Sequence, residues 1–149
     1  MKEAKIKAGR YCTYQERTQQ EVRNKLYEIG LYKDEVEEIL TDLITENYVN
    51  EARYAKTFAS GKFRIKHWGR NKIEYALKQK NISAYCIDLA LKEISDEEYH
   101  LVITQLINKK AMQIADDQYI KKNKIARYII GKGFESELVW KLIHEHLPV

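Results

Sequence analysis

The stretch VRNKLYEIGL at residues 22–31 decides the fold, because it recurs twice further along the chain. Its second copy is IEYALKQKNI at residues 73–82, and its third copy is IARYIIGKGF at residues 125–134. In every copy the first, fifth and tenth positions are apolar, and the first and fifth lie on one face of a helix. A period of about 50 residues is typical of tandem structural repeats.

The ninth position of each copy predicts how the helix ends. It holds Gly30, Asn81 and Gly133 in turn. Gly and, after it, Asn most readily adopt the positive φ that a sharp turn needs just past a helix C-terminus. An apolar residue follows each time and can pack back against the helix that has just ended. We therefore predict a helix–turn–helix connection in all three copies.

The flanking sequence predicts further helices and their starting points. Residues 36–44 and 99–107 each carry apolar side chains at offsets 0, 3, 4, 7 and 8, which is the pattern of a helix with one apolar stripe. Four side chains are expected to cap helix N-termini: Thr18, Asn50, Ser83 and Ser95. Thr18 and Ser95 each have a glutamate three residues later, so both are expected to form a capping box.

These patterns predict an all-α chain of nine helices in three tandem three-helix repeats. The first helices of the repeats are expected at residues 4–14, 50–66 and 96–114, and the repeats themselves at residues 1–48, 49–94 and 95–149. A unit of this size buries little surface alone, so neighbouring units should pack together. The only proline is Pro148, and a chain without internal proline is unlike a β-sandwich or barrel, which needs frequent turns.

Composition excludes several classes of protein. The 149 residues include 26 Lys and Arg against 22 Asp and Glu, a net charge of +4. No apolar stretch approaches the roughly 18 residues of a membrane span, and the charged N-terminus does not resemble a signal peptide. The two cysteines lie far apart, which favours neither a zinc site nor a disulfide framework. With no glycine-rich phosphate loop either, we expect a cytoplasmic protein with no enzymatic activity, cofactor, metal or membrane contact.

Positive charge is concentrated in the later two thirds of the chain. Residues 52–73 contain no acid and hold seven candidate partner-binding cations: Arg53, Lys56, Lys62, Arg64, Lys66, Arg70 and Lys72. Aromatic residues such as Phe58, Phe63 and Trp68 are interleaved with them. Cations beside aromatic faces suit a phosphate backbone and unstacked bases. The alternative is a solvated charged face above aromatic residues that pack in the core.

A second acid-free window covers residues 118–134. It adds four candidate cations: Lys121, Lys122, Lys124 and Arg127. The repeat alignment places Lys124 with Lys72 and with Glu21, so one surface position is basic in the later two repeats and acidic in the first. A face that meets a polyanion with its last two thirds would show this pattern, although charges that only keep the surface soluble would show it too.

The chain has eleven tyrosines, which is many for its length. Seven of them fall on or beside the helical stripes: Tyr11, Tyr14, Tyr27, Tyr32, Tyr54, Tyr75 and Tyr128. We expect most of these rings to pack between helices.

Two segments resemble the RecX family. NYVNEARYAKTFA at residues 47–59 is similar to the family's run at the junction of its first two units, and WGRNKI at residues 68–73 is similar to the opening of its next helix. Asn47 stands where Gly is usual in the family, and Glu51 stands where Asp is usual. The resemblance extends over about residues 11–147.

The resemblance implies a crescent-shaped, cytoplasmic bacterial regulator made of three three-helix units. It implies binding to the RecA recombinase, largely in the groove of the filament that RecA forms on single-stranded DNA, and inhibition of its ATPase and recombination activity. Single-stranded DNA would then be contacted directly or through the filament. We expect the chain to act as a monomer.

Two other functions fit the repeat pattern. One is a helix-turn-helix DNA-binding protein without a RecA partner. Its recognition helices would start at residues 34–38, 84–88 and 135–138, which lack the Arg, Asn and Gln that read base edges. The other is a helical adaptor for an acidic protein, which would lack the steep salt dependence of phosphate contacts.

Overall fold

The computed structural model describes residues 1–147 and contains only helices and their connections in that range. The helices are α1 (Lys2–Tyr14), α2 (Gln19–Ile29), α3 (Lys33–Thr45), α4 (Glu51–Lys66), α5 (Arg70–Gln79), α6 (Ala84–Lys92), α7 (Asp96–Gln113), α8 (Gln118–Gly131) and α9 (Ser136–His146). The all-α prediction is confirmed. None of these helices is long and apolar enough to cross a membrane.

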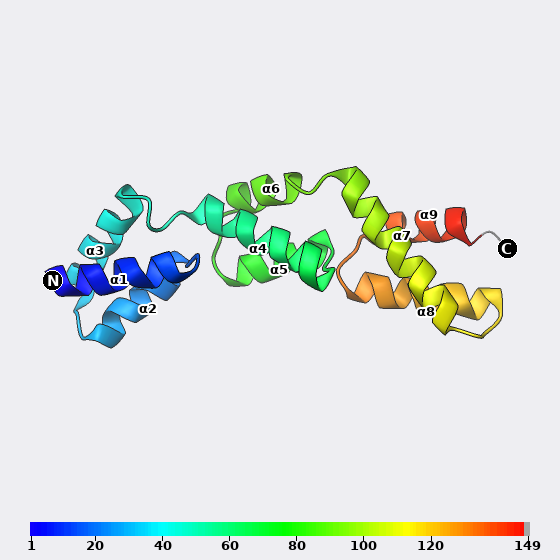
Figure 1. Cartoon of the computed structure of the whole chain (residues 1–149), viewed down its shortest axis with the longest axis horizontal. Helices are drawn as coiled ribbons and strands as arrows, with labels where there is room; N and C mark the ends of the chain where they lie inside the picture. The colour runs from blue at the N-terminus through cyan, green and yellow to red at the C-terminus, as the bar shows by residue number, and fades with distance from the viewer. Residues whose placement is uncertain (148–149) are drawn as a thin grey trace.

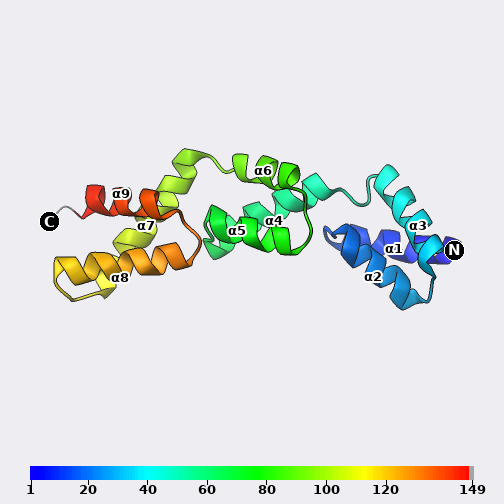
Figure 2. The ribbon, with the colours of Figure 1, turned by 180° about the vertical axis from the view of Figure 1, so that it is seen from behind.

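The helices form three groups of three that follow one another along an elongated molecule, with the chain ends at opposite tips (Figure 1). The view from behind shows the same row (Figure 2). We call the groups unit one, unit two and unit three, with the proposed bounds 1–48, 49–94 and 95–149. These bounds stay a prediction, although no helix crosses either one.

The predicted turn residues have the expected backbone. Gly30, Asn81 and Gly133 have φ angles of 109°, 60° and 100°. The two residues that follow the first two of these turns, Leu31 and Ile82, donate their main-chain N–H back to the preceding helix at 3.3 and 3.1 Å. These bonds satisfy carbonyl groups that a helix end leaves free, so the repeated turn is a helix-ending device.

All four predicted caps accept a main-chain hydrogen bond at the start of their helices, but one of the two predicted capping boxes is only half formed. The Thr18 hydroxyl accepts a hydrogen bond from the main-chain N–H of Glu21, and the Glu21 carboxylate accepts one from the main-chain N–H of Thr18. Asn50 and Ser83 also accept from the main chain of their helices. Ser95 caps α7 in the same way, but the carboxylate of Glu98 binds Arg64 instead of closing the box.

The buried residues form two separate cores. One is made by α1–α3 of unit one together with Val49, the first residue of unit two as bounded above. The other is continuous from α4 to α9, so units two and three share it. At their boundary the fully buried rings of Phe63, Tyr99 and Phe134 meet, with centroids 5.7 and 5.1 Å apart. Shared burial makes units two and three one packed body, whereas unit one is attached to it by residues 46–50 and polar contacts.

The tyrosine prediction is wrong for most of the seven residues. Only Tyr54 among them is buried. Five are exposed: Tyr14, Tyr27, Tyr32, Tyr75 and Tyr128. They lie at the edges of the stripes, where a ring with a polar tip can remain in solvent while the aliphatic residues fill the core.

Candidate polyanion-binding surface

Main-chain contacts fix unit three against unit two. The turn between α4 and α5 meets the turn between α8 and α9, where Gly69 donates its N–H to the Lys132 carbonyl at 2.8 Å and Asn71 donates to Gly133 at 3.0 Å. A Cβ atom on Gly69 would lie 2.3 Å from the Gly133 carbonyl carbon, so only glycine allows this approach. The junction therefore sets how the basic end of α4, the start of α5 and Lys132 after α8 are placed relative to one another.

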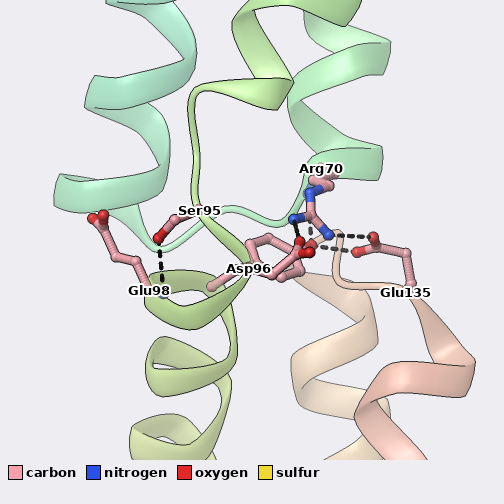
Figure 3. Close-up of polar contacts among 6 residues, drawn as sticks. Arg70, Ser95, Asp96, Glu98 and Glu135 are labelled. Atoms are coloured by element: carbon pink, nitrogen blue, oxygen red, sulfur yellow. Dashed lines mark hydrogen bonds and ion pairs between the residues drawn. The ribbon is translucent and has the colours of Figure 1, made fainter.

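A polar cluster reinforces the same junction. Arg70, at the start of α5, lies between Asp96 of α7 and Glu135 ahead of α9, and its guanidinium nitrogens are 2.8 and 3.1 Å from their carboxylates (Figure 3). The guanidinium also lies 3.8 Å above the ring centroid of Tyr99. The Arg70 side chain is only 22% exposed, so this cation has a structural role between the units.

Tyr99 connects the cluster to the shared core. Its hydroxyl accepts from the Arg70 main-chain N–H at 2.9 Å and donates to the Glu135 carboxylate. Burial, followed by the hydrogen bond to Glu135, raises the pKa of the Tyr99 hydroxyl. The group therefore stays protonated and keeps donating, which holds the N-terminus of α5 in place.

Five of the eleven predicted site residues are paired with carboxylates of the same chain. The pairs are Arg53–Glu16 (2.6 Å), Lys56–Glu93 (3.2 Å), Arg64–Glu98 (2.9 Å), Arg70 with Asp96 and Glu135 (2.8 and 3.1 Å), and Lys124–Asp116 (2.6 Å). The Arg64 guanidinium lowers the pKa of Glu98 through its hydrogen bond. Internal pairing offsets much of the potential that these cations present to a partner.

The other six predicted residues form no ion pair within residues 1–147: Lys62, Lys66, Lys72, Lys121, Lys122 and Arg127. The structure brings Lys62 and Lys72 together at the ring of Trp68, and it places the main-chain carbonyl of Lys66 beside the ammonium group of Lys132. The last three lie on α8, where Arg127 is exposed and the two lysines are half-buried.

Lysines and two aromatic rings form a compact cluster on unit two. The Lys62 ammonium lies 4.8 Å from the ring centroid of Trp68 and 5.5 Å from that of Phe58. Lys72 lies 4.6 Å from the Trp68 centroid, and Lys80 lies 5.8 Å from the Phe58 centroid. The rings themselves meet edge to face, with their centroids 6.4 Å apart. Ring faces hold the ammonium groups in place without neutralising their charge.

The cluster continues onto unit three. Lys132 donates its ammonium to the Lys66 carbonyl at 3.1 Å and lies 5.7 Å from the ring centroid of Tyr128. Lys110 of α7 lies 4.0 Å from the same centroid. We call this set the lysine strip: Lys62, Lys72, Lys80, Lys110, Lys132 and Lys66, which joins it through its main-chain carbonyl.

Sequence reasoning missed half of this strip as site residues. Lys132 falls in the second acid-free window, which is a usable signal. Lys80 and Lys110 have no such signal, because only the fold brings them to the rings of Phe58 and Tyr128. None of the six ammonium groups has a carboxylate within ion-pair distance in the described part of the chain. Six uncompensated cations across one packed body produce a positive surface suited to a polyanion.

No group of three or more metal-ligating side chains occurs among the described residues. Ammonium groups with no ion-pair partner among residues 1–147 lie over aromatic rings on this surface, which suits electrostatic binding. The aromatic rings beneath the ammonium groups add flat apolar area, which single-stranded nucleic acid and protein surfaces both use.

Two family models match the chain. The one described as "RecX, first three-helix domain" matches residues 4–43, and the one described as "RecX, second three-helix domain" matches residues 50–91. Each matched range spans three helices of one unit in the structure. The sequence resemblance and the fold therefore point to the same family.

Named relatives agree with these matches. A "Regulatory protein RecX" from Clostridium botulinum (strain Eklund 17B / Type B) is 30% identical over 132 residues, which are 87% of this chain and 61% of the relative. One from Prosthecochloris aestuarii is 27% identical and covers 92% of this chain and 89% of the relative. The chain thus spans less than two thirds of the clostridial relative's length.

Among solved structures, the crystal structure of RecX from Lactobacillus salivarius superposes with a TM-score of 0.91 at 26% identity. The match covers 99% of this chain and 97% of that one. A second crystal structure, of a regulatory protein RecX, gives a TM-score of 0.81 and covers 95% of this chain and 73% of that one. The arrangement of the helices along the whole chain is therefore shared.

Proposed function

The chain belongs to the RecX family, and from that membership we propose that it regulates the RecA recombinase. In this proposal it binds the filament that RecA forms on single-stranded DNA, lies in the filament groove as a monomer in the bacterial cytoplasm, and inhibits ATPase and recombination activity. Single-stranded DNA is contacted directly or through the filament.

The observation that carries the proposal is the lysine strip on a rigid two-unit body. Units two and three share one core and are fixed by main-chain contacts at Gly69 and Gly133. A surface on one packed body loses little conformational entropy on binding. Its electrostatic attraction for a polyanion is therefore not offset by the free-energy cost of ordering the protein. The unpaired ammonium groups of the strip supply that attraction.

Inhibition requires a difference in affinity between filament states. A ligand that binds two states equally shifts nothing, however tightly it binds. An elongated body that spans adjacent protomers favours the filament geometry in which its contacts all fit. We propose that this favoured geometry is one in which ATP hydrolysis is slow.

The test is the RecA ATPase rate on single-stranded DNA, measured with increasing amounts of this chain. We expect the rate to fall to a low plateau as the chain saturates the filament, and the amount needed to rise with salt concentration. An ATPase rate that stays constant while the chain binds the same DNA without RecA would instead support the DNA-binding alternative. Inhibition that is insensitive to salt would support a role as an adaptor for a protein surface without phosphate contacts.

A further inference from the structure

A cavity of about 410 Å³ lies on unit three, outside the lysine strip. It is lined by Gln118, Tyr119, Lys122, Asn123, Trp140 and His144. Its residues come from the start of α8 and from α9. The Trp140 ring stacks on His144, with their centroids 5.7 Å apart and their planes at 29°. The cavity thus has a flat aromatic wall.

Polar groups at the cavity have hydrogen-bonding capacity to spare. The Asn123 amide nitrogen donates to the Tyr119 carbonyl at 2.8 Å, which leaves the side-chain oxygen of Asn123 unused. The amide of Gln118 makes no side-chain hydrogen bond within the described residues. Amide edges beside an aromatic wall suit a flat heterocycle that carries both donors and acceptors.

The charge around the cavity favours an anionic ligand. Lys122, at its edge, and the neighbouring Lys121 form no ion pair within residues 1–147. Of the two acids just ahead of α8, Asp116 binds Lys124 and Asp117 caps the helix. A flat heterocycle attached to a phosphate therefore fits this cavity, because the ring can lie against Trp140 and the phosphate can lie near Lys122.

We propose that this cavity binds one unstacked base of single-stranded nucleic acid, with the base against Trp140 and the adjoining phosphate near Lys122. The proposal deepens the proposed function and rests on its premise that the chain meets single-stranded DNA. Trp68 is unsuited to the same task, since Lys62 and Lys72 already lie over its ring. The two tryptophans thus have different roles: the Trp68 ring contacts lysine ammonium groups, and the Trp140 ring stacks on a base.

The experiment uses tryptophan fluorescence, because the chain has only these two tryptophans. In the Trp68→Phe variant the signal reports Trp140 alone. The probes are a short oligodeoxythymidylate and an abasic phosphodiester strand of equal length. We expect oligodeoxythymidylate to quench Trp140 and the abasic strand to leave it unchanged, because stacking needs a base.

A second variant keeps the proposal testable without disturbing the core. Tyr119 is 79% exposed, so Tyr119→Ala should fold normally. Tyr119→Ala should weaken binding of oligodeoxythymidylate by roughly fivefold or more and leave binding of the abasic strand unchanged. The reference variant is Tyr14→Ala, at a residue that is 83% exposed in unit one, and it should bind both strands as the parent does.

The outcomes separate this proposal from the proposed function. Equal quenching by both strands would overturn the base site in favour of phosphate binding alone. Unchanged Trp140 fluorescence while the strand is bound, or quenching only by a peptide that carries an aromatic side chain, would also overturn it.

If RecA ATPase falls while the Trp140 fluorescence stays unchanged, the proposed function stands without this cavity. If Trp140 responds while RecA is unaffected, the cavity binds bases and the RecA proposal fails.

Discussion

Replacing Gly69 by alanine is expected to separate unit three from unit two. The new Cβ would lie 2.3 Å from the carbonyl carbon of Gly133 and 2.3 Å from the main-chain nitrogen of Phe134. Both are backbone atoms, so no side-chain rotation can relieve the clash and the shared core must open. We expect the free energy of unfolding of this body to fall by about 3 kcal/mol or more. Urea unfolding followed by circular dichroism measures the loss.

Gly61→Ala is the matched control. Gly61 lies inside α4, and a Cβ there would meet nothing within 4 Å. Alanine is the better helix former, so this variant should gain about 0.5–1 kcal/mol. An unfolding midpoint for Gly69→Ala equal to that of the parent would contradict the close main-chain approach of Gly69 to Gly133.

Reversing three charges of the lysine strip is expected to abolish inhibition of RecA. The variant carries Lys62→Glu, Lys72→Glu and Lys132→Glu, which span both units and pair with no carboxylate in the described chain. The logarithm of the binding constant falls as the logarithm of the salt concentration rises, and each lost phosphate contact makes this dependence less steep by about 1. The slope of the triple variant should therefore be about three less steep than that of the parent. Filament binding at several salt concentrations measures the slope, and RecA ATPase measures the inhibition.

The control reverses the same amount of charge on unit one, as Lys2→Glu, Lys7→Glu and Lys33→Glu. All three lysines are exposed. This variant should keep most of the inhibition of RecA ATPase, and its filament binding should depend on salt as steeply as that of the parent. Equal losses in the two variants would mean that net charge matters and the strip does not. Arg70 is left intact, since its reversal would break the pairs with Asp96 and Glu135 that hold the junction.

Much of the fold could be predicted because it depends on local backbone chemistry. A positive φ after a helix can be recognised from one residue, as at Gly30, Asn81 and Gly133. The N-caps at Thr18 and Asn50 likewise depend on neighbours within three residues. The first-helix prediction of residues 96–114 differs from α7 by a single residue for the same reason.

The site was less predictable because charge pairing depends on tertiary structure. Arg64 and Glu98 are far apart in the sequence, and Glu98 also fitted a local capping box. Only the packing of α4 against α7 decides that the carboxylate binds Arg64. Lys80 and Lys110 join the strip through rings that no sequence window places beside them.

The separate core of unit one also escaped sequence reasoning. All three repeats share the same apolar anchors, which gives no sign that only the last two merge into one core. The merger depends on Tyr99 and Phe134 meeting Phe63 across the unit boundary. The repeat alignment treats each unit as equivalent and cannot show this contact.

The most direct measurement is the reactivity of each lysine towards acetylation, read by mass spectrometry, with the chain free and bound to RecA filaments on single-stranded DNA. We expect Lys62, Lys72 and Lys132 to lose reactivity on binding, while Lys2 and Lys7 keep theirs. Unchanged reactivity at the three strip lysines, with protection only on unit one, would contradict it.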